Sequence, residues 1–262
     1  MAAVETALRQ ARAAGRPSLV TYVTGGIRAD WTDLLAAMIE AGADAVEIGL
    51  PFSDPMLDGR TIQQASAAAI GRGAKIAGIL GQLSAAAVGD VPLIAMTYAN
   101  HAYSRGLPAF CRQLADAGLS GVITPDLPAV EAGDYLEAAG QAGLDATLMV
   151  TPATGQEQIK AIAGRTRGFL YVMSVMATTG NSRVNADSAR WAVSVRARRH
   201  SPLPVLIGFG IDTPGRAAAA ARHAEGVIVA SALMRRVLDG ASCADIGRDV
   251  AALRTALDQA RP

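Results

Sequence analysis

Two carboxylate side chains stand out in the stretch of sequence from residue 44 to residue 64. Glu47 lies inside the short apolar run Ala45–Ile48, and Asp58 follows in a loop that begins near Pro51. Apolar surroundings disfavour the charged form of a carboxyl group, so the pKa of Glu47 should be raised, and Glu47 could act as both acid and base. Asp58 should stay ionised, and it could bind a hydrogen-bond donor or a developing positive charge.

Both carboxylates also have a structural interpretation. Glu47 could cap a backbone group or pair with an arginine, although charges are rarely buried unpaired and perturbed carboxylates gather at functional sites, which favours catalysis. Asp58 before Gly59 is also a common turn pair, and for Asp58 the two interpretations stay open. Thr61 is expected to cap the next helix, with Gln64 completing a capping box.

A second group of residues combines glycines with helix-start signals. It contains Gly208, Phe209 and Gly210, followed further along the chain by Ala230 and Ser231. Glycine lets the backbone approach an anion closely, and backbone N–H groups at helix starts bind phosphate without any lysine or arginine. In barrels of alternating strands and helices, phosphate sites form after the seventh and eighth strands. The pattern therefore favours a phosphate site over ordinary turn chemistry.

Other residue types narrow the chemistry. The two lysines, Lys75 and Lys160, fall in helical patterns, which disfavours a Schiff-base mechanism. The histidines are scattered, no metal-ligand spacing is visible, and neither cysteine follows a strand. The chemistry that remains is proton transfer by carboxylates, without a cofactor or a metal. Tyr22 and Tyr171 lie in strand patterns, where lining a pocket and packing in a core are both open.

Eight short apolar runs must position these residues, and helical patterns separate them. The runs are Leu19–Val23, Ala45–Ile48, Leu93–Met96, Gly121–Ile123, Thr147–Val150, Phe169–Met173, Val205–Ile207 and Gly226–Val229. Strands that are apolar on both faces and alternate with helices indicate a parallel sheet covered all round. Repetition to eight favours a closed (β/α)8 barrel, the TIM barrel, in the α/β class. An extra N-terminal helix is expected over Ala2–Ala14, and no linker divides residues 1–262, which predicts a single domain.

Composition excludes several function classes. The chain has 262 residues, 24 basic and 23 acidic, so its net charge of +1 gives no basis for binding nucleic acid or an anionic membrane surface. No apolar run is long enough to span a bilayer. Two distant cysteines argue against a disulfide framework and favour a reducing compartment. We therefore expect a cytoplasmic protein.

The carboxylate stretch closely resembles the signature of the tryptophan synthase alpha chain family. The matching segments, in the family's order and over nearly the whole chain, are Val46–Pro55, Asp58–Gly59, Thr61–Gln63, Met96–Asn100, Pro125–Pro128, Ser174–Gly180 and Gly208–Ile211. The resemblance implies a single barrel that cleaves indole-3-glycerol phosphate into indole and glyceraldehyde 3-phosphate. It also implies a pyridoxal-phosphate beta subunit as a partner that receives the indole.

The resemblance also implies roles for individual residues. Glu47 corresponds to the catalytic acid–base, and Asp58 to the aspartate that holds the indole N–H. Tyr171 corresponds to a pocket residue beside the glycerol chain, and Tyr22 and Tyr98 are expected to bind substrate as well. The phosphate-binding positions are Gly180, Gly208, Phe209, Gly210, Ala230 and Ser231.

Four positions depart from the family's usual pattern. Arg60 stands where many members have proline, and Tyr22 stands where phenylalanine is usual. Ala177 replaces a glycine in the loop after the sixth strand, where closure over substrate needs flexibility. Ala230 replaces the common glycine before Ser231, and its methyl group would approach the phosphate. These changes leave the carboxylates in place and bear on partner binding, loop closure and phosphate affinity.

Three functions are open at this point. The first is the alpha subunit of a tryptophan synthase. The second is a free-standing indole-3-glycerol phosphate lyase that releases indole without a beta subunit. The third is a barrel kept as a binding or regulatory subunit without catalysis, against which the presence of both Glu47 and Asp58 counts.

Overall fold

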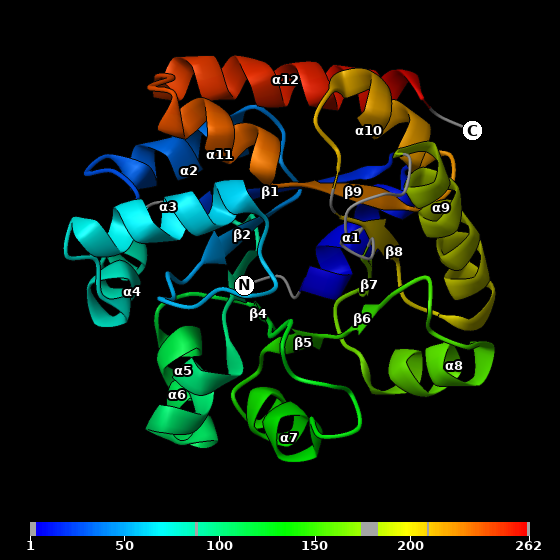
Figure 1. Cartoon of the computed structure of the whole chain (residues 1–262), viewed down its shortest axis with the longest axis horizontal. Coiled ribbons are helices and arrows are strands. Elements are labelled where there is room, and N and C mark those ends of the chain that lie inside the picture. Colours follow the sequence, from blue (N-terminus) through cyan, green and yellow to red (C-terminus); the bar gives the residue numbers. More distant parts are fainter. Residues whose placement is uncertain (1–3, 87–88, 174–182, 209, 261–262) are drawn as a thin grey trace.

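Strands and helices alternate around a ring in the computed structural model, which describes residues 4–86, 89–173, 183–208 and 210–260 (Figure 1). The strands are β1 (Ser18–Thr24), β2 (Ala45–Gly49), β3 (Leu93–Met96), β4 (Gly121–Ile123), β5 (Asp145–Thr147), β6 (Met149–Val150), β7 (Leu170–Val172), β8 (Val205–Ile207) and β9 (Gly226–Val229). The helices are α1 (Val4–Ala13), α2 (Trp31–Glu40), α3 (Arg60–Gly71), α4 (Ile76–Ala85), α5 (Ala99–Arg105), α6 (Leu107–Asp116), α7 (Gly133–Gln141), α8 (Gln156–Arg165), α9 (Arg183–His200), α10 (Pro214–Ala221), α11 (Ser231–Leu238) and α12 (Cys243–Gln259).

The sheet closes on itself through a strand in two parts. Every pairing of neighbouring strands is parallel, and the order runs β5-β4-β3-β2-β1-β9-β8-β7-β6. Only Leu148 separates β5 from β6, so the two ends of this order are joined in the chain. The pair β5 and β6 is therefore the fifth strand of an eight-position barrel. The predicted (β/α)8 barrel is confirmed, and the run Thr147–Val150 corresponds to its divided strand.

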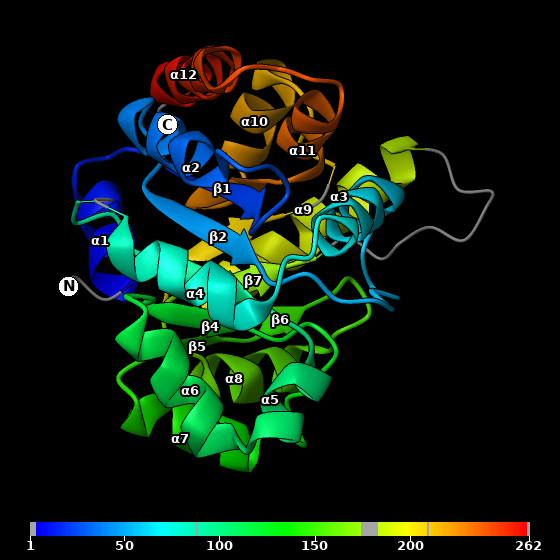
Figure 2. The same cartoon turned by 90° about the vertical axis from the view of Figure 1, so that its left-hand side faces the viewer.

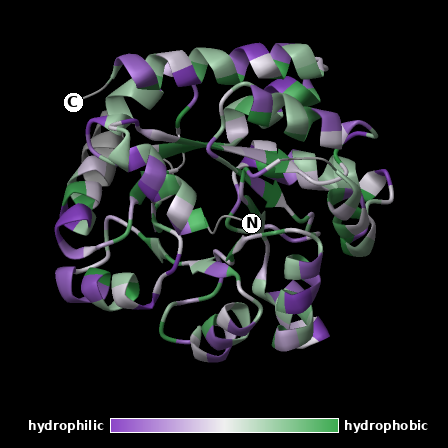
Figure 3. Ribbon diagram, turned by 180° about the vertical axis from the view of Figure 1, so that it is seen from behind, coloured by the Kyte–Doolittle hydropathy of each residue, from purple (hydrophilic) through white to green (hydrophobic). Residues whose placement is uncertain are grey.

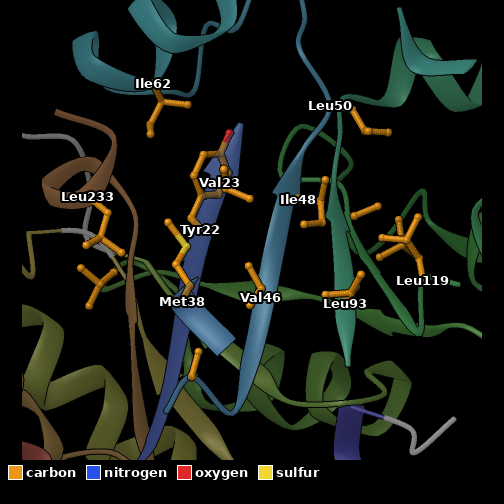
Figure 4. Close-up of a cluster of buried hydrophobic side chains, with 14 of the residues drawn as sticks. Tyr22, Val23, Met38, Val46, Ile48, Leu50, Ile62, Leu93, Leu119 and Leu233 are labelled. Atoms are coloured by element: carbon orange, nitrogen blue, oxygen red, sulfur yellow. The ribbon is translucent and has the colours of Figure 1, made fainter. Parts of the chain in front are cut away.

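Two hydrophobic layers follow from the alternation of side chains along each strand. On β2, Ala45 belongs to the inner layer, whereas Val46 and Ile48 belong to the outer one, which lies between the strands and the helices. Part of the outer layer is seen in Figure 4, where side chains from β2 and β3 lie beside those of surrounding segments. Glu47 has the same parity as Ala45, so its side chain enters the barrel.

The N-terminal helix closes one end of the barrel. Val4 and Leu8 of α1 are fully buried, and they belong to the inner layer together with Ile94 and Phe169. The backbone N–H of Glu5 donates to a carboxylate oxygen of Asp145 at 3.1 Å, which ties α1 to the start of β5. Figure 1 shows α1 inside the ring of strands. The expected extra helix is thus a plug that excludes water from the barrel interior.

The remaining helices form a shell around the strands (Figure 2). Figure 3 shows that these helices carry both hydrophilic and hydrophobic residues, as helices with one face on a sheet should. None of the helices in the described part of the chain is long and apolar enough to cross a membrane.

One local expectation was wrong. Thr61 does not cap α3, because the helix already begins at Arg60, with Gly59 in the capping position and no side-chain cap. The Thr61 hydroxyl instead accepts a hydrogen bond from Arg235 of α11 at 2.8 Å. A local pattern also gives no start signal for the helix after β3, Ala99–Arg105, whose first N–H donates to both oxygens of Asp126, at 2.9 and 3.1 Å. A carboxylate distant in sequence supplied the missing start signal.

Leu8→Ala should lower the free energy of unfolding by about 2–5 kcal/mol, because it opens a cavity within the inner layer. Val130→Ala is the matched control, since Val130 is 85% exposed and its loss should cost under about 0.5 kcal/mol. Urea unfolding of both variants measures the difference. Equal stability of the two variants would contradict the role of α1 as a plug.

Candidate active site

A cavity of about 240 Å³ opens at the carboxyl ends of the strands. Polar groups from β1, β2, β7 and the following loops line it: Tyr22, Glu47, Asp58, Tyr171, Asp212 and Ser231. Its apolar lining includes Ile62, Met96, Ile211 and Ile228. Residues far apart in sequence thus meet at one end of the barrel, where enzymes of this architecture carry out their chemistry.

Glu47 is the most deeply placed charged group of the cavity. It lies at the centre of β2, directly opposite Tyr22 of β1 in the strand register, and is 1% exposed. Its oxygen Oε1 has no hydrogen-bond partner. Burial, with a smaller contribution from the Asp58 carboxylate, raises the pKa of Glu47 to about 8. At neutral pH the side chain therefore carries a proton that it can give to a ligand in the cavity.

Asp58 is held over the barrel by a short network of hydrogen bonds. The Tyr98 hydroxyl donates to Asp58 Oδ2 at 3.1 Å, and it accepts from the backbone N–H of Leu57 at 3.2 Å. The ring of Phe52 stacks on that of Tyr98, with 4.9 Å between the ring centroids. Burial raises the pKa of Asp58 to about 6, and the hydrogen bond from Tyr98 opposes this rise. Asp58 is thus ionised above that pH while Glu47 keeps its proton.

Two tyrosines shape the cavity walls by crossing over glycines of neighbouring strands. A methyl group at Gly49 would overlap the Tyr22 hydroxyl, and one at Gly208 would overlap the hydroxyl of Tyr171. The Thr24 hydroxyl lies 3.4 Å from the Tyr22 hydroxyl and donates toward it. Burial raises the pKa values of both tyrosines, so both stay protonated. These hydroxyls can orient a polar substrate without taking part as bases.

The far rim of the cavity is built from turns and helix starts. Gly210 has a φ of 71°, a conformation that favours glycine, and its carbonyl oxygen accepts from Arg216 Nε at 2.8 Å. Thr213 caps α10 by accepting from the backbone N–H of Arg216 at 3.3 Å. Ser231 is the first residue of α11, so the N–H groups of that helix start point to the rim.

The structure brings most of the predicted site residues together. Seven of them line the cavity: Glu47, Asp58, Tyr22, Tyr171, Gly210, Ala230 and Ser231. Tyr98 lies behind Asp58 rather than in the cavity wall, and Gly208 lies beneath Tyr171. Gly180 and Phe209, with Ala177, lie outside the described residues.

Sequence analysis did not identify the apolar lining as part of the site. Met96 and Ile228 are inward-facing strand residues near the carboxyl ends of β3 and β9, and strand parity could have identified them. Ile62 enters from α3, and its place depends on where that helix begins. Asp212 brings a further carboxylate to the rim, 3.4 Å from Arg216 Nε.

A closed barrel with two carboxylates of different pKa at this end falls in the broad class of (β/α)8-barrel enzymes that move protons. Comparisons with known proteins narrow the class. The family model described as tryptophan synthase alpha chain matches residues 8–259. This chain therefore belongs to the tryptophan synthase alpha chain family.

Individual relatives agree with this assignment. The tryptophan synthase alpha chain of Phenylobacterium zucineum is 42% identical over 243 residues, covering 91% of this chain and 86% of the relative. That of Halorhodospira halophila is 38% identical, with 98% and 97% covered. A crystal structure of tryptophan synthase from M. tuberculosis has a TM-score of 0.88 at 31% identity, covering 98% of this chain and 100% of the other. The subunit alpha from Legionella pneumophila gives a TM-score of 0.89 at 29% identity, covering 99% of each chain.

Glu47→Gln should stabilise the protein at alkaline pH. Because the folded-state pKa of Glu47 is raised from 4.5 to about 8, folding favours the protonated form, and this stabilisation is lost progressively as the pH rises from 4.5 to about 8. Glutamine resembles the protonated carboxyl and does not titrate. The variant should exceed the wild type by about 2–4 kcal/mol at pH 9 and differ little at pH 4.5. Thermal unfolding at the two pH values measures this, and parallel pH profiles would contradict it.

Tyr98→Phe should raise the pKa of Asp58 further, because it removes the hydrogen bond that favours the ionised carboxylate. The expected rise is about one pKa unit. A carbon-13 NMR titration of the Asp58 carboxyl group measures it directly. Tyr103→Phe is the control, since Tyr103 is 50% exposed and should leave the Asp58 titration unchanged.

Proposed function

We propose that this chain cleaves indole-3-glycerol phosphate to indole and glyceraldehyde 3-phosphate, the retro-aldol reaction of the tryptophan synthase alpha chain family. The observation that carries the proposal is the buried, unpartnered carboxyl of Glu47 in the same cavity as Asp58. Their pKa values of about 8 and about 6 leave one group protonated and the other ionised between these limits. This difference in pKa makes Glu47 the acid and Asp58 the group that stabilises positive charge.

The first step is the transfer of a proton from Glu47 to C3 of the indole ring. The ring then carries a positive charge that is centred on its nitrogen. Asp58 accepts the indole N–H hydrogen bond and stabilises this charge as it develops. Tyr98 supports the step as a positioning residue, because its hydroxyl bonds Asp58 and its ring stacks on Phe52.

The second step breaks the carbon–carbon bond. The carboxylate of Glu47, now ionised, takes the proton of the hydroxyl on the side-chain carbon attached to C3. That carbon becomes the aldehyde carbon of glyceraldehyde 3-phosphate. The bonding electron pair returns to the ring as the C2–C3 double bond and neutralises the nitrogen. Glu47 ends protonated, so one carboxyl group serves as acid and then as base.

Substrate orientation comes from the rim and the tyrosines. The phosphate binds at the backbone N–H groups near Gly210 and the start of α11 at Ser231, in keeping with the family's phosphate-binding positions. Tyr171 lies beside the glycerol chain and Tyr22 completes this wall of the substrate site, whereas Tyr98 acts through Asp58. Binding the phosphate at a distance from the reacting carbon fixes the orientation of the bond that breaks.

As a member of this family, the chain acts with a beta subunit that carries pyridoxal phosphate and receives the indole. The solved structures of similar chains include tryptophan synthase from M. tuberculosis in an aminoacrylate-bound form. We place the protein in the cytoplasm, as one domain over its 262 residues. The alternative of a free-standing lyase is distinguished by the rate of the chain alone.

The test is an assay of indole release from indole-3-glycerol phosphate by the purified chain, with and without a beta subunit. Glu47→Gln should lower kcat by at least about a hundredfold, and Asp58→Asn should lower it comparably. The kcat/KM of the wild type should be highest between pH 6 and pH 8, because it needs ionised Asp58 and protonated Glu47.

A low rate that rises on addition of the beta subunit supports the subunit function, whereas high turnover alone supports the free-standing lyase. Undiminished activity of Glu47→Gln would contradict the proposed chemistry and favour a binding or regulatory role.

A further inference from the structure

A second cleft, of about 410 Å³, lies at the opposite end of the barrel from the active-site cavity. Its lining includes Pro17 and Glu225, which directly precede β1 and β9. The active-site cavity opens beyond the other ends of the same two strands, where Ala230 follows β9. The cleft is therefore separate from the site proposed for indole-3-glycerol phosphate.

The side chains of this cleft are strongly basic. Four arginines line it, Arg12, Arg16, Arg198 and Arg222, against one acidic residue, Glu225. They come from α1, from the segment between α1 and β1, from α9 and from the end of α10. The whole chain has a net charge of only +1, so this concentration of positive charge is local.

Two of the arginines already have acidic partners. Arg16 Nη1 donates to Asp44 at 3.2 Å, and Asp44 also accepts from Arg254 at 3.2 Å. Arg198 Nε donates to Glu225 at 2.9 Å, and the other Glu225 oxygen accepts from the backbone N–H of Val205 at 2.9 Å. These carboxylates are thus occupied, and they hold Arg16 and Arg198 in place.

Arg12 and Arg222 differ from this pair. Both are exposed, and within the described residues neither guanidinium group has a hydrogen bond or an ion pair. Glu225, the acidic residue of the cleft lining, is already engaged by Arg198 and by the backbone N–H of Val205. Two guanidinium groups therefore line a concave, basic space, and their N–H groups have no acceptor among the described residues.

We propose that this cleft binds a phosphorylated small molecule, with Arg12 and Arg222 donating to its phosphate oxygens. Guanidinium groups match phosphate in geometry and can donate two parallel hydrogen bonds each. The volume falls in the range of about 300–1,000 Å³ that is usual for small-molecule sites, so it accepts a ligand larger than one phosphate group. Among the described residues no aromatic side chain lines the cleft, which favours a compact anion over single-stranded nucleic acid.

The test uses pyrophosphate as the probe and the full chain. Calorimetry should detect its binding, and NMR should show saturable shifts of the amides of Gly15, Ala224 and Gln259 in the cleft. The Gly210 and Ser231 amides report separately on any anion in the active site. The double variant Arg12→Ser/Arg222→Ser should weaken binding at the cleft by at least about tenfold, as loss of two charge-assisted donors predicts.

The matched control is Arg72→Ser/Arg112→Ser, which removes the same charge from two exposed arginines that do not line the cleft. This control should bind pyrophosphate within about twofold of the wild type. Equal weakening in both double variants would overturn the proposal, because the loss of binding would then follow from the lower net charge and not from the cleft. So would an absence of cleft shifts, or equal affinity for acetate.

Unchanged amide shifts at Gly210 and Ser231 in the ligand-free Arg12→Ser/Arg222→Ser variant show that it is folded. Failure of the proposed lyase function would leave the cleft experiment unaffected, because the two are read from different amides and different assays.

Discussion

The physical constraint at the centre of this protein is the burial of one ionisable carboxyl group in a dry interior. Glu47 has an oxygen without a partner and is 1% exposed, so its charged form is strongly disfavoured. An apolar inner layer below it and the plug formed by α1 keep water from relieving that cost. The closed barrel thus keeps the pKa of Glu47 raised, whereas in an open sheet water would stabilise the charged form and lower that pKa.

The second carboxylate is controlled in a different way. Asp58 lies on a loop, and without further contacts its side chain would occupy several positions with different pKa values. Tyr98 fixes it by bonding its carboxylate and the adjacent Leu57 N–H, and Phe52 fixes the tyrosine ring in turn. The hydrogen bond between Arg235 and Thr61 links the helix after this loop to α11, which begins at the rim. The Asp58 end and the rim end of the substrate site are therefore connected by side-chain hydrogen bonds as well as by the barrel.

Local sequence patterns were sufficient to predict the eight strand positions, the parallel barrel and the apolar surroundings of Glu47, because apolar runs depend only on neighbours in the chain. The cap at Gly59 and the helix at Ala99 could not be predicted in this way. Their determinants, Arg235 and Asp126, are distant in sequence and meet these segments only in the folded barrel. The position of Tyr98 behind Asp58 has the same origin, since 40 residues separate the two.

The crossing of Tyr22 over Gly49 and of Tyr171 over Gly208 bears on how such an enzyme can evolve. In each pair the large residue on one strand occupies the space that the small residue on the next leaves empty. A replacement at either glycine is blocked while its tyrosine remains, whereas shortening a tyrosine is permitted at once. Mutational routes to bulkier aromatic substrates are consequently ordered: the tyrosines must change first, and only afterwards do the glycine positions become variable.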